Sequence, residues 1–297
     1  MPPAGAYGTA DAVLLWPATQ AGIEKQLSQH PEMANEAGLP FWKRSHYLDR
    51  MSFRELVVAY FQHYTIITYL GLTALAVMAF AFNPAGLGQT LASIAAGVLI
   101  YPLAWHLLHQ NVLHSRWMWK SRLLSPIWKR IHYDPHQDPN DLSVLFGALY
   151  TTVPTIAIAT LPLGWAIGGV GGAAAAFGTG LLTTCYYEFM HCIQHLAFKP
   201  KWNWVQHMKL RHMEHHFFDE SGNFGITNYV WDRVFGTYYE KKDRPKRSPT
   251  VFNLGYNEHV AEAYPWVKQL SGGVASGHPR RRTPIVSGAK DGEQASA

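Results

Sequence analysis

Cysteine and charged residues are both scarce in this sequence. The chain has 297 residues, of which only two are cysteines, Cys185 and Cys192, and 15% are charged. A typical soluble domain carries about 25% charged residues, so the low share favours a membrane protein. If one helix carries both thiols, they are separated by about 10 Å, which is too far for a disulfide. Neither cysteine belongs to a Cys-x2-Cys pattern, which argues against a thiolate zinc site.

Lysine and arginine are absent from two long parts of the chain. All 25 lie in residues 25–54, 116–130 and 199–290, so residues 55–115 and 131–198 contain none. This clustering, at a net charge of +5, is typical of basic segments that flank membrane spans. The sequence also lacks a helix-turn-helix, a zinc finger and an aromatic RNA-binding pattern. We therefore expect no nucleic-acid partner.

Apolar runs of about 20 residues, long enough to cross a bilayer, lie in the two parts without basic residues. They cover roughly residues 56–82, 87–108, 142–163 and 165–187. Short turns near residues 83–86 and 162–164 join them in pairs, and neither turn contains lysine or arginine. We predict an all-α integral membrane protein with four transmembrane helices in two hairpins. A soluble helical core is the competing interpretation, but it would need four long helices without a basic residue.

The basic residues all lie on one side of this topology. By the positive-inside rule, residues 1–54, the segment 109–141 and the C-terminal third are expected on the cytoplasmic side. The predicted domains are an N-terminal cytoplasmic arm (1–54), a transmembrane domain with a cytoplasmic helical cap (55–255) and a largely disordered tail (256–297). Residues 1–20 lack the basic and apolar regions of a secretory signal peptide. The expected localisation is multi-pass, in the membrane.

Histidines gather where the polar segments meet the predicted spans. His212, His215 and His216 are spaced so that an α-helix would place them on one face. Three pairs precede them in the chain: His109 and His114, His132 and His136, and His191 and His195. Neutral imidazole is a common ligand of zinc, copper and iron. Since one metal takes about four to six ligands, nine histidines predict a site for two metals on the cytoplasmic side.

The spacing within each pair makes a different prediction. The third pair is four residues apart and would share a helix face. The second pair has the same spacing, but Pro135 and Pro139 favour a loop there. The first pair is five residues apart, about 140° on an ideal helix, and needs a distorted helix or two separate metals. His106 and His207 are reserve candidates, and His63, inside the first apolar run, is expected to form an interhelical hydrogen bond.

The ligand set leaves more than one metal chemistry open. An almost all-imidazole site for two metals beside a lipid-facing wall suits iron and dioxygen. A hydrolytic pair of zinc ions usually includes carboxylates, and Asp134, Glu188 and Glu214 lie near the histidines in the sequence. That alternative therefore stays open. A transporter would hold its ligands near the bilayer midplane, whereas these histidines lie outside the predicted spans.

The ordered histidine motifs resemble those of the membrane fatty acid hydroxylase/sterol desaturase superfamily and are most similar to its fatty acid 2-hydroxylase branch. The resemblance rests on the three pairs, on Tyr187-Glu188 before the third pair, and on the His-x2-His-His motif that ends at His216. The segments 222–226 and 231–237, Gly-Asn-Phe-Gly-Ile and Trp-Asp-Arg-Val-Phe-Gly-Thr, are also similar to the family. The resemblance covers about residues 55–240.

This resemblance implies a centre of two iron ions, or alternatively zinc, held by the nine histidines named above. It also implies oxygen insertion into, or desaturation at, an unactivated C–H bond of a lipid chain, using O2 and two electrons. The chain has no His-Pro-Gly-Gly haem motif, so a separate electron-transfer protein is expected to supply the electrons. We predict a fatty acyl hydroxylase. A sterol or acyl desaturase and a non-redox metal-binding membrane protein are the alternatives.

The second histidine motif departs from the family pattern. When the proline and aspartate that follow it are matched to those of the family, Pro135 stands where the middle histidine belongs. Proline has no side-chain donor atom, so one metal loses a ligand unless His106, His207 or Asp134 replaces it. Gln110 likewise stands where the family often has arginine. Both changes point to a diverged member or to altered reactivity.

Overall fold

The structure is a computed structural model, and it describes residues 46–275, which belong to one compact unit. Within this part of the chain the regular elements are helices, apart from an isolated bridge between Tyr47 and Asp141. In chain order they are η3 (Leu48–Arg50), α3 (Phe53–Gln62), α4 (Tyr64–Phe82), α5 (Leu87–Leu108), η4 (His109–Leu113), α6 (Ser125–Trp128), η5 (Lys129–Tyr133), α7 (Asp134–Gln137), α8 (Leu142–Leu145), α9 (Leu149–His195), α10 (Asn203–Phe217), α11 (Val230–Phe235), η6 (Lys241–Asp243), α12 (Glu258–Ala263) and α13 (Trp266–Ser271). The all-α prediction is confirmed for the described residues.

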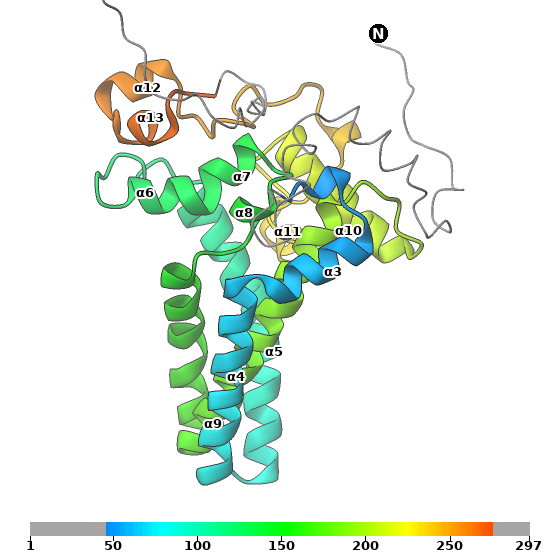
Figure 1. Cartoon of the computed structure of the whole chain (residues 1–297), viewed down its shortest axis with the longest axis vertical. Coiled ribbons are helices and arrows are strands. Elements are labelled where there is room, and N and C mark those ends of the chain that lie inside the picture. The colour runs from blue at the N-terminus through cyan, green and yellow to red at the C-terminus, as the bar shows by residue number, and fades with distance from the viewer. Residues whose placement is uncertain (1–45, 276–297) are drawn as a thin grey trace, which may run out of the picture. The chain divides into compact units, whose positions relative to one another are not determined.

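Three helical stretches are long and apolar enough to cross a membrane: Tyr64–Phe82, Leu87–Leu113 and Leu142–His195. Their mean hydropathies are 2.0, 1.7 and 1.7, and only 22%, 17% and 28% of their apolar windows are buried inside the protein. Exposed apolar surface of this extent is unfavourable in water and favourable in lipid. Helix α9 packs against both α4 and α5, so the three stretches lie side by side (Figure 1).

Helix α9 reverses direction in its middle, so the third and fourth predicted spans lie within one continuous stretch. Gly168 and Gly169 have non-helical backbone angles, and Gly169 has a φ of 58°, in the left-handed region that favours glycine. The chain then runs back along itself. The close approach of the two limbs shows this, since a side chain at Gly164 would collide with the backbone of Gly172. The predicted turn at residues 162–164 is therefore wrong in position. The left-handed glycine, not the proline before it, turns the chain.

The first apolar run is divided at His63. Helix α3 ends one residue before it and α4 begins one residue after it, and Figure 1 shows α3 turned away from the axis of α4. The Nδ1 of His63 accepts a hydrogen bond from the N–H of Thr65 at 3.3 Å, and the ring stacks on Phe146 at 4.0 Å. The prediction that one span covers residues 56–82, with His63 bonded between helices, is therefore wrong. His63 instead caps the start of α4.

The remaining helices form a cap at one end of the three long stretches (Figure 1). A buried core that includes Trp128, Tyr133 and Tyr256 joins α6 and η5 to α12 and α13. The Tyr256 hydroxyl donates a hydrogen bond to the Tyr264 carbonyl oxygen at 2.6 Å. The expected start of the tail at residue 256 thus falls inside a packed core, because aromatic side chains there have partners from earlier in the chain. Residues 1–45 and 276–297, most of the expected arm and tail, lie outside the described residues.

Candidate metal centre

All nine candidate histidines converge in space. Their ring nitrogens lie within 4.8 Å of one another in three sets: His191, His195, His212 and His216; His109, His114 and His132; and His114, His136 and His215. The last two sets share His114, so the nine residues form a four-histidine group and a five-histidine group. The two groups adjoin each other, since the rings of His136 and His216 are 4.5 Å apart.

A π-helical turn places the first pair on one face. The turn is η4, and the His114 N–H donates a hydrogen bond to the His109 carbonyl oxygen at 3.1 Å. In a regular α-helix, residues five apart diverge by about 140°. The wider turn brings the two ring centroids to 5.1 Å. The distortion that the spacing requires is thus present, and π-helical turns occur frequently at functional sites.

The second pair lies on a helix and not in the predicted loop. Elements α6, η5 and α7 follow one another without a break from Ser125 to Gln137. Pro135 is the second residue of α7, which directly follows the π-helical turn η5. The rings of His132 and His136 are 4.8 Å apart. The loop that the prolines predicted around this pair is therefore wrong.

Helices α9 and α10 supply the other five histidines. The Nε2 atoms of His195 and His212 face each other at 3.0 Å, and the rings of His212 and His216 are 4.6 Å apart. His215 belongs to the other group, with its ring 4.8 Å from that of His109. One stretch of α10 therefore contributes to both groups. Because α10 belongs to the cap, these contacts join the cap to the ends of α5 and α9.

Backbone carbonyl groups orient three rings of the five-histidine group. The hydrogen bonds run from His109 Nδ1 to Phe224 O at 2.7 Å, from His136 Nδ1 to Val251 O at 2.8 Å and from His215 Nδ1 to Gly222 O at 2.7 Å. Each bond selects the tautomer whose Nε2 carries a lone pair, as is typical of metal-binding histidine. The Nε2 atoms of His136 and His215 are buried and have no other partner among the described residues. These orphaned nitrogens fit a metal ion.

Burial also keeps the imidazoles neutral. It lowers the pKa of His136 and of His215 to about 3. It holds the pKa of His132, His212 and His216 well below the usual value of 6.5. Loss of hydration is the largest cause, and repulsion from neighbouring histidines adds to it. Because the neutral ring is the metal-binding form, the site is prepared for cations at neutral pH.

A buried carboxylate holds the segment that supplies two of these carbonyl groups. Asp232 accepts hydrogen bonds from the Phe224 N–H at 2.7 Å and the Gly225 N–H at 2.9 Å. The Thr237 hydroxyl donates to the same carboxylate at 2.8 Å. A side chain at Gly225 would crowd Asp232, so this close approach requires glycine. In the sequence, these segments stood out only by their resemblance to the family. A lone aspartate beside a glycine-rich turn was the signal for this role.

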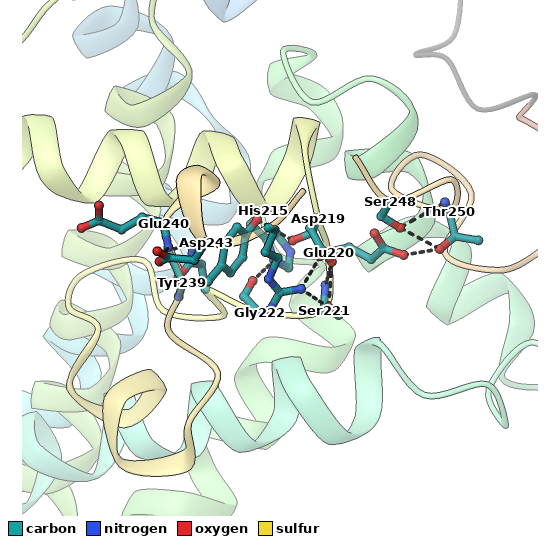
Figure 2. A network of polar contacts seen from close by, with 12 residues as sticks. His215, Asp219, Glu220, Ser221, Gly222, Tyr239, Glu240, Asp243, Ser248 and Thr250 are labelled. Carbon is teal, nitrogen blue, oxygen red and sulfur yellow. Dashed lines mark hydrogen bonds and ion pairs between the residues drawn. The ribbon is translucent and has the colours of Figure 1, made fainter. Parts of the chain in front are cut away.

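A polar network supports the turn at Gly222, whose carbonyl group orients His215 (Figure 2). Arg244 forms an ion pair with Asp219, just before this turn. The Tyr239 hydroxyl donates a hydrogen bond to the Asp219 carbonyl oxygen at 2.7 Å. The backbone next to the metal site is therefore held by both a side-chain ion pair and a hydrogen bond to the main chain.

His106 does not join either histidine group. Its Nε2 lies 3.1 Å from the side-chain oxygen of Gln110, and its Nδ1 lies 3.5 Å from a carboxylate oxygen of Asp232. The histidine therefore links α5 to the segment that Asp232 organises. Gln110, the second departure from the family pattern, is its partner in this contact.

The other two reserve candidates also point elsewhere. The Nε2 of His207 lies 3.3 Å from the Tyr238 hydroxyl, and Asp134 forms an ion pair with Lys129 at 2.7 Å. Neither belongs to a histidine group in the described part of the chain. None of the three reserve candidates therefore supplies the ligand that the family has at the position of Pro135.

A largely apolar cavity of about 250 Å³ reaches the histidines. Side chains of α5, such as Ile100 and Leu108, and of α9, such as Ile156 and Ala159, line it. Imidazoles from both groups form part of its wall, and so does Pro135. The position at which the family has a further histidine thus faces the cavity. An apolar chain in this cavity would lie against the metal site.

Comparison with known proteins agrees with this geometry. The family model described as fatty acid hydroxylase matches residues 94–237, a segment that contains all nine histidines. The chain is similar to the ceramide very long chain fatty acid hydroxylase of Saccharomyces cerevisiae (29% identical over 149 residues), to the fatty acid 2-hydroxylase of Rattus norvegicus (28% over 157) and to a dihydroceramide fatty acyl 2-hydroxylase of Arabidopsis thaliana (31% over 160). These matches cover 48%, 50% and 52% of this chain, and 36%, 40% and 64% of the relatives.

A solved structure described as full-length Scs7p, with only its hydroxylase domain visible, is similar in fold. The TM-score is 0.51 at 23% sequence identity, and the match covers 68% of this chain and 71% of that chain. At this identity the likeness concerns the fold alone. The chain spans less than half of the length of the yeast and rat relatives that it matches.

Proposed function

This chain belongs, through residues 94–237, to the fatty acid hydroxylase family, and from this premise we propose that it is an O2-dependent membrane hydroxylase of a lipid. A fatty acyl chain is the proposed substrate. The observation that carries the proposal is the convergence of nine histidines, five of which line a largely apolar cavity. In the proposed reaction, one oxygen atom of O2 enters a C–H bond and the other becomes water. This consumes two electrons and two protons.

Two iron ions are the proposed cofactor, one for each histidine group. When bound, they would supply the activation of O2. The protein's own contribution is to present neutral nitrogen ligands, which burial and the carbonyl hydrogen bonds to His109, His136 and His215 support. Zinc would fit the same ligands, so metal analysis must accompany any assay. A separate electron-transfer protein is the proposed source of electrons.

The proposed topology has four membrane spans with the metal site on the cytoplasmic side. The first limb of α9, residues 149–167, is about 29 Å long, which matches a hydrocarbon core of about 30 Å. The second limb leads back from Gly169 toward the histidines at its end. Residues 55–115 and 131–198 contain no lysine or arginine, whereas the polar segments that carry the cap do. By the positive-inside rule, the cap would face the cytoplasm.

The cavity is the proposed binding site for the acyl chain. Its apolar side chains belong to helices whose outer surfaces would face lipid, so a chain could enter without crossing water. The same side chains would exclude water from the space beside the histidines. A non-redox transport role has less support, since the histidines lie at the ends of the apolar helices and not near their middle.

Lipid mass spectrometry of cells with and without the protein tests the proposal. A product heavier by one oxygen atom, which carries label when labelled O2 is supplied, would support hydroxylation. A product lighter by two hydrogen atoms would assign desaturation instead. Unchanged lipids in cells that contain the iron-loaded protein and a working electron donor would contradict both.

Variants of the histidines connect the product to the site. We expect His195→Ala and His212→Ala each to abolish the product while membrane insertion remains normal, because both rings face the same point in the four-histidine group. His259→Ala is the matched control, since His259 is exposed on α12 and its side chain is 93% accessible. Full activity in either of the first two variants would count against the ligand assignment.

A further inference from the structure

The chain between α9 and α10 exposes aromatic and basic side chains next to one another. Residues 198–204 read Phe-Lys-Pro-Lys-Trp-Asn-Trp, and we call them the aromatic-basic segment. Trp202 and Trp204 are 70% and 51% exposed, and Lys199 and Lys201 are exposed beside them. Tryptophan is highly buried on average in soluble proteins, so two exposed indoles in one short segment indicate a binding surface. The segment contains no member of either histidine group.

Helix α10 holds the backbone of this segment in place. Gln206 Nε2 donates a hydrogen bond to the carbonyl oxygen of Pro200 at 2.6 Å. Lys209 Nζ donates to the carbonyl oxygen of Phe198 at 3.1 Å and also to that of Leu196. Because these donors come from the first turns of α10, the segment is fixed against that helix. It therefore presents its exposed side chains in one arrangement, as a binding surface requires.

The length of α9 puts the segment at the surface of the bilayer. The second limb of α9 runs from Gly169 to His195. A helix needs about 20 residues to cross a hydrocarbon core of about 30 Å, so this limb leaves the core near Phe189. The rest of the limb rises about 9 Å, which is the order of one headgroup layer. The aromatic-basic segment follows directly, where the headgroups meet water.

Helix α3 marks the same level independently. The rings of Phe53 and Tyr60 lie 6.1 Å and 5.0 Å from the ring of Phe189 on α9. Phe53 and Phe61 are 52% and 57% exposed, and α3 is turned away from the axis of α4 (Figure 1). A short helix with exposed aromatic side chains at the start of a span is typical of the membrane–water interface. Helix α10 also packs against α9, at the junction of the long stretches and the cap.

The side chains of the segment match the chemistry of a lipid surface. Tryptophan is enriched at membrane–water interfaces because its ring is apolar and its N–H is polar. Lysine near a membrane is attracted to anionic headgroups. Residues 189–213 contain four basic residues and no aspartate or glutamate, so this stretch of chain carries only positive charge. The combination favours an anionic lipid surface as the partner.

We propose that the aromatic-basic segment anchors the cap to the bilayer leaflet on its own side and binds anionic lipid headgroups there. The rings of Trp202 and Trp204 lie among the headgroups, and the ammonium groups of Lys199 and Lys201 bind lipid phosphate groups. This assignment rests on the proposed topology of four spans and not on the proposed reaction. The anchor sets the depth of α10, and with it the position of the histidines that α10 supplies to both groups.

Quenching of tryptophan fluorescence by lipids tests the contact. The full-length protein is placed in bilayer discs of phosphatidylcholine and phosphatidylglycerol, and one of the two lipids carries bromine near the top of its acyl chains. The emission of the two indoles is the difference between the wild-type protein and the Trp202→Phe/Trp204→Phe protein. We expect both lipids to quench this difference emission. The anionic lipid should do so at a lower mole fraction, by roughly 5-fold for each lysine.

Lysine variants separate the headgroup contact from general charge attraction. Lys199→Gln/Lys201→Gln should remove the preference for the anionic lipid while both lipids still quench the two indoles. Lys242→Gln/Lys246→Gln is the matched control, because it removes the same charge from two other exposed lysines of the cap. We expect this control to keep the preference. Added salt should weaken the preference of the wild-type protein, since exposed charges are screened.

The outcomes are independent of the proposed reaction. A difference emission that neither lipid quenches would overturn the anchor and assign the surface to a protein partner, even if the iron-loaded protein hydroxylates lipids. Equal quenching by both lipids in the wild-type protein would overturn the binding of anionic headgroups. So would a preference that both pairs of lysine changes remove to the same extent. A preference that only Lys199→Gln/Lys201→Gln removes would support the proposal even if no hydroxylated product is found.

Discussion

The two metal ions should leave the protein at different rates. Three rings of the five-histidine group donate their Nδ1–H to backbone carbonyl groups. In the four-histidine group, the Nδ1 atoms of His195, His212 and His216 are buried and have no partner among the described residues. Partners of this kind hold metal ligands in position and typically contribute about 10- to 100-fold in metal affinity. Even if only one missing partner matters, we expect the ion in the four-histidine group to bind at least about 10-fold more weakly than the ion in the five-histidine group.

Metal analysis during chelation measures this difference. The loaded protein is mixed with an excess of chelator, and the metal that remains per chain is followed in time. We expect a fast and a slow phase of similar amplitude. His195→Ala should remove the fast phase and keep the slow one, because His195 belongs to the weaker group. Pro135→His should slow the fast phase, because Pro135 lines the cavity together with His191, His212 and His216 of the four-histidine group.

Two results would refute this reasoning. If both ions leave in one phase at one rate, the carbonyl hydrogen bonds do not distinguish the groups. If His195→Ala removes the slow phase instead, the groups have been ranked in the wrong order. Measuring the metal content before chelation controls for variants that never load two ions.

Other perturbations test the surrounding structure. Asp232→Asn should lower the thermal midpoint and the metal content, because each charge-assisted hydrogen bond to this carboxylate is worth roughly 1.5–3 kcal/mol; unchanged values would contradict its role in holding the turn. Gly164→Val should prevent packing of the two limbs of α9, whereas Gly71→Val, where nothing lies within 4 Å, should be tolerated; equal yields of folded protein would refute the close approach. The metal-free protein should lose thermal stability as pH falls from 6.5 toward 3, because the unfolded chain protonates His136 and His215 in this window while the folded state does not; a flat profile would show that these rings are not buried.

Local sequence patterns were sufficient for the composition of the site. The absence of lysine and arginine from residues 55–115 and 131–198 marked the apolar helices, and the second run matches α5 in both bounds. The short spacings within each histidine pair indicated that neighbouring rings would meet. The five-residue spacing of His109 and His114 also required a distorted helix, which η4 provides. Such predictions succeed because they depend on residues within one or two helical turns.

The partition of the histidines was decided only by tertiary structure. Sequence spacing placed His212, His215 and His216 on one face, but α10 lies between two groups, so His215 is assigned to one and its neighbours to the other. The chain reversal at Gly169 depends on a left-handed backbone conformation and on packing between the limbs of α9. The capping role of His63 depends likewise on its stacking against Phe146.

The sequence by itself determined that this is a helical membrane protein with nine histidines able to bind metals, because hydropathy and helical periodicity are local properties. The tertiary structure decided which carbonyl groups orient those histidines, that His106, His207 and Asp134 point away from the histidine groups, and which histidine nitrogens have no partner among the described residues. The physical reason is that a hydrogen bond such as that from His109 to Phe224 joins residues more than a hundred positions apart. Only packing of the whole chain brings its donor and acceptor together.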